Sequence, residues 1–172
     1  MGTTEEELRR RRDEIVREHV ESENRHEFDV TLATFDHPRY ELIATGEVHD
    51  GPEEVADYFA ETRAAFPDQR NEVIAVHHAG DMVLVEAWLR GTHLGSYRGL
   101  PPTGRSFETR FAAAFLFEED RLVCERVYFD SSTMLRQLGV ARDPLGITGR
   151  VGTLIGHPLT ISRGIVRRIT GR

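Results

Sequence analysis

The chain has 172 residues, of which 39% are hydrophobic and 30% charged, a balance typical of an ordinary globular domain and not of a disordered chain. All 22 basic residues are arginine, which excludes mechanisms that form an imine with a lysine amine. Residues 1–139 hold 16 Arg against 28 Asp and Glu, and residues 140–172 hold six Arg against one Asp; the acidic body speaks against nucleic acid as a partner.

Hydropathy indicates a cellular location, and the single cysteine can be assessed as a possible nucleophile. No apolar run reaches the roughly 18 residues of a membrane span, and the segment 1–12 lacks the apolar core of a signal peptide. We therefore expect a cytoplasmic location. The single cysteine, Cys124, lies within a predicted strand, where an inert buried thiol is favoured over a nucleophile.

Helices are predicted in the first part of the chain. Thr4 followed by Glu7 forms a capping-box pattern, and the apolar positions of the helix that follows, which include His19, recur at helical spacing to about His26. A short helix is expected over 28–35. Asp50-Gly51-Pro52 starts a third helix, because Pro52 suits the first helical turn.

Strands follow these helices. The segment 40–44 has the pattern of a short strand, and after Pro67 the hydrophobic period changes to two, which predicts strands over 71–78, 82–94, 106–117 and 121–129. Asp130 then caps a helix over 133–138. Helices followed by a four-strand meander predict an α+β fold in which helices cover one face of a curved antiparallel sheet. We assign residues 1–139 to this domain and 140–172 to a basic, partly helical tail.

The alternation on the last two strands predicts which side chains point inward. Phe107, Thr109, Phe111, Ala113 and Phe115 share one face of 106–117, and Glu125, Val127 and Phe129 share one face of 121–129. We expect this face and the helices to enclose an apolar pocket for a small organic ligand. Its predicted lining comprises Tyr58, Phe59, Trp88, Phe111, Ala113, Phe115, Val127 and Phe129.

Glu125 and His93 are the candidate catalytic residues. Burial among phenylalanines destabilises the charged form of a carboxylate, so Glu125 could exchange protons near neutral pH. The alternative is a Glu125 that pairs with an arginine of a neighbouring strand, such as Arg110 or Arg90. His93 lies near the end of its strand, and a lone histidine there is often a hydrogen-bonded structural residue.

Metal and nucleotide sites find little support in the sequence. His77 and His78 are neighbours on a strand and so point to opposite faces, and no H-E-x-x-H helix is present. The glycines after residue 90 match neither a Rossmann fingerprint nor a P-loop. We predict no metal and no cofactor.

Three segments carry a family resemblance. The run from Gly91 to Arg105, GTHLGSYRGLPPTGR, then RVYFD at 126–130 and LRQLG at 135–139, resembles the SnoaL-like polyketide cyclase (ester cyclase) family over about residues 8–139. The resemblance implies the conical fold of nuclear transport factor two-like proteins, which can dimerise. It also implies ring closure of a polyketide by intramolecular aldol chemistry without metal or cofactor, with a strand aspartate as general acid and base.

The resemblance meets an obstacle at the active site. It places the family's catalytic aspartate at Val127 and a histidine associated with that site at Ala113, whereas Asp130 matches a family position that suits a helix cap. One hypothesis is therefore a cyclase or isomerase in which Glu125 replaces the aspartate. The other is a non-catalytic protein that holds an apolar metabolite by burial alone.

The tail, residues 145–172, suggests a third role. Ile161, Ile165, Val166 and Ile169 line one side of a predicted short helix, and Arg163, Arg167 and Arg168 line the rest. Basic amphipathic helices bind anionic membranes or acidic surfaces. The alternative is docking on the acidic body of the same chain or of a twin subunit.

Overall fold

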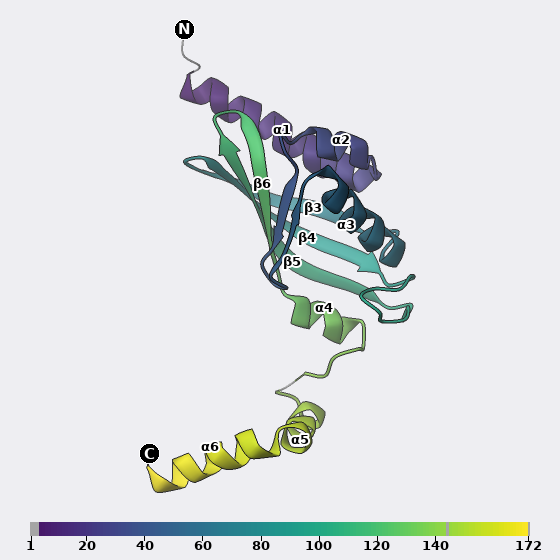
Figure 1. Cartoon of the computed structure of the whole chain (residues 1–172), viewed down its shortest axis with the longest axis vertical. Coiled ribbons are helices and arrows are strands. Elements are labelled where there is room, and N and C mark those ends of the chain that lie inside the picture. Colours follow the sequence, from purple (N-terminus) through teal and green to yellow (C-terminus); the bar gives the residue numbers. More distant parts are fainter. Residues whose placement is uncertain (1–3, 144, 172) are drawn as a thin grey trace.

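The computed structural model describes residues 4–143 and 145–171, so Met1–Thr3, Pro144 and Arg172 lie outside the described residues (Figure 1). Helix α1 (Glu5–Arg25) begins at the predicted capping box, where the Thr4 hydroxyl accepts a hydrogen bond from the Glu7 backbone N–H at 3.2 Å. Helix α2 (Phe28–Ala33) follows. Helix α3 (Pro52–Ala65) begins at Pro52 as predicted.

Six strands form one sheet in the order β2-β1-β6-β5-β4-β3. The predicted meander is confirmed as β3 (Arg70–Ala79), β4 (Met82–Thr92), β5 (Ser106–Glu118) and β6 (Arg121–Phe129), each antiparallel to the next. The predicted short strand is β1 (Arg39–Leu42), which pairs parallel with β6. Sequence reasoning missed β2 (Glu47–Asp50), because four half-buried or exposed residues carry no apolar alternation.

The sheet curves around helices α1–α3, which cover its inner face (Figure 1). Alternation fixes what that face carries: Ala113 pairs with Val127 and Phe115 with Glu125 across the β5–β6 register. The main core joins Val16 and Val20 of α1 to Phe115 and to neighbouring buried residues of the sheet. The α+β class predicted from the sequence is confirmed.

Three helices complete the chain. Asp130 caps α4 (Ser131–Gln137) by accepting from the Thr133 backbone N–H at 2.9 Å. Beyond α4 the tail forms α5 (Ile147–Gly156) and α6 (Pro158–Thr170), which stand away from the sheet (Figure 1). The sequence predicted only the second of them, because the three glycines of α5 lower its helix propensity. Within the described ranges no helix is long and apolar enough to cross a membrane.

Candidate functional site

A buried acid–base pair lies between α1 and the inner face of β6. His19 is fully buried and Glu125 is 4% exposed, and His19 Nε2 lies 3.0 Å from Glu125 Oε2. The same nitrogen lies 2.6 Å from the Tyr40 hydroxyl of β1. That tyrosine contact has hydrogen-bond geometry, whereas Glu125 Oε2 has no well-aligned hydrogen-bond partner among the described residues. The imidazole ring also packs edge-on against Phe35 and Phe115, at 5.3 and 5.2 Å between ring centroids.

Both ring nitrogens of His19 lie within hydrogen-bonding distance of a hydroxyl group. The Thr34 hydroxyl donates to the Thr31 carbonyl at 2.6 Å, so its oxygen accepts from His19 Nδ1 at 2.8 Å and Nδ1 carries a proton. In a neutral ring Nε2 then accepts from Tyr40, and it also faces Glu125 Oε2. Two acceptors at that distance repel unless a proton lies between them. His19 and Glu125 thus bring an imidazole and a carboxylate, two group types that serve in general acid–base catalysis, to 3.0 Å of each other.

Other ionisable groups share this interior. Burial, followed by the negative charges of Glu125 and Glu23, raises the pKa of Tyr40 well above its usual value. The pKa of Tyr58, on α3, is raised mainly by burial as well. Burial and then the charge of Glu125 raise the pKa of Glu23, although Asn71 donates to its Oε2 at 2.8 Å. Both tyrosines are thus neutral hydroxyl donors over the physiological pH range.

We expect Tyr40 and Tyr58 to ionise only when the protein unfolds. Phenols with raised pKa values in the folded state contribute stability that is present below their unfolded pKa of about 10 and is lost as the pH rises above it. Ultraviolet titration should show two of the four tyrosines ionising together with the loss of far-ultraviolet circular dichroism. Tyr40→Phe should reduce the amplitude of this late phase. Ionisation of all four phenols in a native fold would contradict the burial.

Glu23→Gln is expected to flatten the pH dependence of stability. Folding raises the pKa of Glu23. Glu23 therefore contributes its full share to the free energy of unfolding below its unfolded-state pKa of about 4.3, and this share is lost as the pH rises through its folded-state pKa. The wild type should therefore lose more free energy of unfolding than the variant between acidic and neutral pH, as urea titrations can measure. Equal losses in the two proteins would contradict the raised pKa.

The interior next to Tyr58 and Val127 is nearly closed. Its central cavity has a volume of about 40 Å³ and is lined by side chains that include Tyr58, Val127 and Phe129, which is room for about one water molecule. A pocket for a drug-sized ligand is roughly 300–1,000 Å³. The open pocket expected from the sequence is therefore not present in this conformation.

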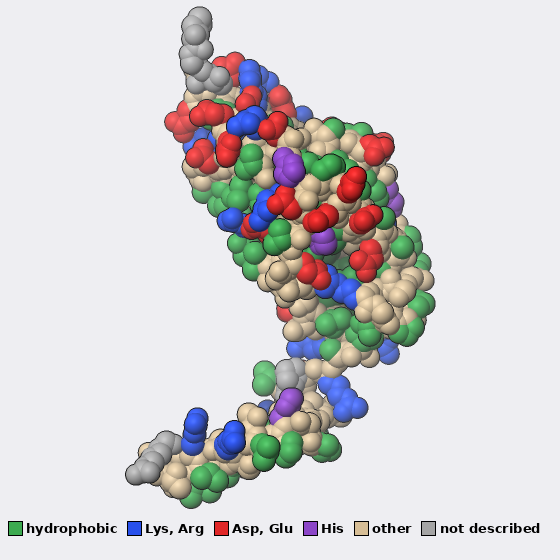
Figure 2. Space-filling model, viewed as in Figure 1, with side chains coloured by type: hydrophobic (Ala, Val, Ile, Leu, Met, Phe, Trp, Pro, Cys, Tyr) green, Lys and Arg blue, Asp and Glu red, His purple; other side chains and the backbone are tan. Residues whose placement is uncertain are grey.

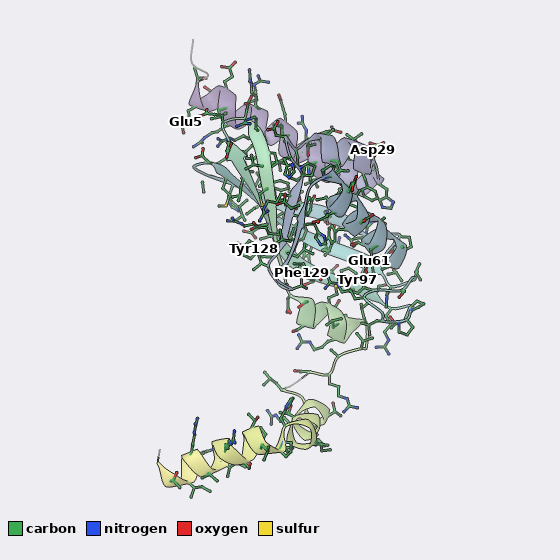
Figure 3. The ribbon with its side chains drawn as sticks, viewed as in Figure 1. Glu5, Asp29, Glu61, Tyr97, Tyr128 and Phe129 are labelled. Carbon is green, nitrogen blue, oxygen red and sulfur yellow. The ribbon has the colours of Figure 1, made fainter. Side chains whose placement is uncertain are left out.

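A vestibule lies directly outside the cavity. It has a volume of about 210 Å³ between α4, the 94–105 loop and the β1–β2 turn. Tyr97, Phe129 and Met134 line both spaces, so they form the wall that the two share. Figure 3 shows Tyr97 and Phe129 beside each other at this end of the sheet. Displacement of these side chains would join the cavity to the surface.

The other predicted lining residues divide between cavity, core and outer face. Phe59, Ala113 and Phe115 are buried in the main core, and Phe111 packs against it. Trp88 contradicts the prediction, because it lies on the outer face of β4, where Arg110 and Arg90 stand over its ring at 5.1 and 5.9 Å.

Side chains alternate between the two faces of β4, and this alternation places Trp88 on the outer face. Val83, Val85 and Ala87 are the fully buried residues of β4, so the even-numbered positions face outward. Trp88 therefore belongs to a charged surface.

His93 is buried at a distance from the acid–base pair. Its ring packs against Phe66 at 5.3 Å, its Nδ1 lies 3.2 Å from the Thr103 hydroxyl, and its backbone N–H donates to the Arg105 carbonyl at 2.9 Å. These contacts fasten the 94–105 loop to the end of the sheet. The partners of His93 therefore differ from those of Glu125, and they favour the structural interpretation of this histidine.

The proposed arginine partners of Glu125 are also corrected. Arg110 pairs with Glu86 at 2.9 Å and Arg90 with Glu108 at 2.5 Å, all on the outer face. Sequence reasoning missed His19 as the partner of Glu125. The available signal was a histidine at an apolar position of α1, and it could not identify the strand opposite.

Neither the cysteine nor a cluster of metal ligands contributes to this site. Cys124 is buried, and burial raises the pKa of its thiol to about 11, which makes it a poor nucleophile. Within residues 4–143 and 145–171, no three His, Cys, Asp or Glu side chains come together as metal ligands.

Sequence comparison identifies relatives of known reaction. Residues 13–138 match the SnoaL-like polyketide cyclase family. The nogalonic acid methyl ester cyclase of Streptomyces nogalater is 32% identical over 106 residues, which cover 60% of this chain and 79% of that enzyme. The aklanonic acid methyl ester cyclase AcmA of Streptomyces galilaeus is 31% identical over 127 residues, covering 72% and 88%.

Solved structures share the fold. The protein IdmH of Streptomyces antibioticus superimposes with a TM-score of 0.61 at 29% identity, over 75% of this chain and 99% of IdmH. A SnoaL-like protein of Jannaschia sp. CCS1 gives a TM-score of 0.69 at 20% identity, over 77% and 94%. The family match ends at residue 138, so the tail lies outside it.

Proposed function

Because the chain belongs to the SnoaL-like polyketide cyclase family, we propose that it closes a ring in a polyketide ester by cofactor-free aldol chemistry in the interior of the sheet. The substrate class is inferred from the two methyl ester cyclases, whose names specify such esters. An apolar interior with a few polar groups suits a multi-ketone substrate.

The observation that carries this proposal is the buried contact between His19 and Glu125. The resemblance places the catalytic aspartate of the family at Val127, which cannot transfer a proton. Glu125 lies two residues away on the same face of β6, and its Oε2 is 3.0 Å from His19 Nε2. The pair therefore restores acid–base capacity at a neighbouring position of the same strand.

The reaction removes one proton from a carbon of the substrate and returns one proton to an oxygen of the product. The pair takes a proton from the carbon next to a ketone, and the resulting enolate carbon forms a bond to a second carbonyl carbon of the same molecule. The alkoxide oxygen then receives the proton, so the product is an isomer of the substrate. Tyr58 lines the cavity, and its neutral hydroxyl would donate to the enolate oxygen.

The substrate would enter from the vestibule. Movement of Tyr97 and Met134 away from Phe129 joins the vestibule to the cavity, and Tyr58 lies next, with its ring 5.8 Å from that of Tyr40. A bound ester thus displaces side chains to reach the acid–base pair. Such a fit excludes water from the enolate.

A second candidate is a non-catalytic binding protein. Val127 and Ala113 occupy the positions that the resemblance assigns to the polar groups of the family, and they face each other across β5 and β6. If Glu125 serves only as the buried partner of His19, the same interior would bind an apolar ketone and leave it unchanged.

One assay distinguishes these functions. The purified full chain is incubated, without added metal or cofactor, with nogalonic or aklanonic acid methyl ester, and the mixture is analysed by liquid chromatography and mass spectrometry. The proposal predicts a product of unchanged mass and new retention time. An ester that binds but is recovered unchanged favours the binding protein. An ester that does not bind at all overturns both candidates for this substrate class.

A further inference from the structure

The tail carries most of the large apolar side chains that are at least half exposed in the described chain. Nine large apolar residues between Leu145 and Ile169 are at least half exposed, whereas only Leu94 reaches that level elsewhere in the described chain. Patches of this kind on a folded protein mark sites of interaction. The nine are Leu145, Ile147, Val151, Leu154, Ile155, Leu159, Ile165, Val166 and Ile169.

Helix α6 separates its apolar and basic residues. At 3.6 residues per turn, one side of the helix carries Leu159, Ile161, Ile165, Val166 and Ile169, and the other carries Arg163, Arg167 and Arg168. Arg163 and Arg168 border the apolar side at its two edges. Long arginine side chains in such positions extend their charged ends toward water or phosphate while the helix lies on an apolar layer.

The charge of the tail is entirely of one sign beyond Asp143. Residues 144–172 hold five Arg and no Asp or Glu. Figure 2 shows blue and green side chains along the tail, and red side chains gathered over the body. A surface that satisfies both the arginines and the apolar side must therefore be anionic and apolar.

Residues 140–143, at the start of the tail, are bound to α4. The backbone N–H groups of Val140 and Ala141 both donate to the Leu135 carbonyl, at 3.1 and 3.2 Å, and Arg136 lies 3.6 Å from Asp143. These contacts tie residues 140–143 to α4. Helices α5 and α6 lie away from the sheet (Figure 1), and large apolar side chains of both helices, such as Ile155 and Ile169, remain exposed.

The apolar groove between α1 and β3 is a poor docking site for this tail. A groove of about 460 Å³ runs between α1 and β3 over Val73 and Val76. Its charged rim consists of Asp13, Arg17 and Glu21. The rim is mixed in sign, and its two carboxylates already pair with a histidine at 2.9 Å and an arginine at 3.8 Å. A row of arginines finds little free countercharge there.

We propose that α5 and α6 bind the surface of a membrane rich in anionic phospholipid. The apolar side of each helix lies at the level of the acyl chains, and Arg163, Arg167 and Arg168 contact lipid phosphates. The acidic body, which is repelled by the same surface, stays in water. This binding is independent of the proposed cyclisation and would place the enzyme at a layer into which apolar ketones partition.

The test uses the full chain and sedimentation with two kinds of vesicle, phosphatidylcholine alone and equimolar phosphatidylcholine and phosphatidylglycerol. We expect binding to the anionic vesicles, weakened by salt. Replacing Arg163, Arg167 and Arg168 by glutamine should weaken it on the order of 10²-fold. Ile165→Asp, in the middle of the apolar side, should abolish it.

Thr160→Asp provides the matched control, because it adds the same negative charge on the basic side of α6 and should weaken binding only about fivefold. Equal losses in Ile165→Asp and Thr160→Asp would overturn the interfacial orientation. Equal binding to both vesicles would overturn the role of anionic lipid. Absence of vesicle binding, with dimers in solution that Ile165→Asp dissociates, would overturn the proposal in favour of a second copy of this chain.

Discussion

Replacement of Glu125 by glutamine is expected to lower the turnover of a cyclised ester by about 10²- to 10⁴-fold. Glutamine has the same shape and can keep the packing between Phe115 and His19, but its amide cannot accept and return a proton. The measurement is the initial rate of ring closure with either methyl ester. A second measurement is the rate at which the carbon next to the ketone exchanges hydrogen for deuterium in heavy water.

The exchange rate separates chemistry from binding. If Glu125 and His19 remove the proton, Glu125→Gln should lose exchange and ring closure together while the dissociation constant of the ester changes little. Glu86→Gln is the matched control, because it makes the same change on the outer face, where Glu86 pairs with Arg110. Full turnover by Glu125→Gln, with the melting temperature retained, would contradict the assignment of this pair.

Gly95→Ala is expected to destabilise the protein by about 3 kcal/mol. A Cβ at position 95 would stand 2.0 Å from the backbone oxygen of Ala64 at the end of α3, and backbone atoms cannot move aside as a flexible side chain does. The change also disturbs the bonds from the N–H groups of Leu94 and Gly95 to the Ala65 carbonyl, at 2.9 and 3.1 Å. Urea unfolding measures the loss.

The control for this glycine is Gly99→Ala in the same loop. Gly99 has a φ of +79°, and a methyl group added there would have nothing within 4 Å of it, so alanine costs about 1 kcal/mol of backbone strain. A loss at position 95 no larger than that at position 99 would contradict the close approach of the loop to α3. Because Tyr97 belongs to this loop, Gly95→Ala should also loosen the wall between cavity and vestibule.

The closed cavity links stability to function in this protein. An interior that holds about one water is well packed, and admission of a substrate has to displace Tyr97 or Met134. The 94–105 loop is held by Gly95 and His93, so in the proposed function its movement would admit the ester.

The sequence by itself determined the local elements. The capping box at Thr4, Pro52 at the start of α3 and the period-two alternation of the four long strands each depend on neighbours within a few residues, and each prediction was confirmed. The same alternation correctly placed Phe115, Glu125 and Val127 on one face. These patterns, together with the glycine-proline run after Gly91, were sufficient to predict the fold and the family.

Only the tertiary structure decided which chemical groups meet. His19 and Glu125 are more than a hundred residues apart in the chain, and they meet because α1 crosses the inner face of β6. Trp88 shares its face with Glu86 and Arg90, so the charged residues of β4 were a local signal for the outer face that the prediction did not use. The volume of the cavity depends on side chains from α3, α4 and the sheet at once. Burial and contact are sums over distant elements, whereas helix and strand periods are properties of adjacent residues, and for that reason the fold was predictable and the site was not.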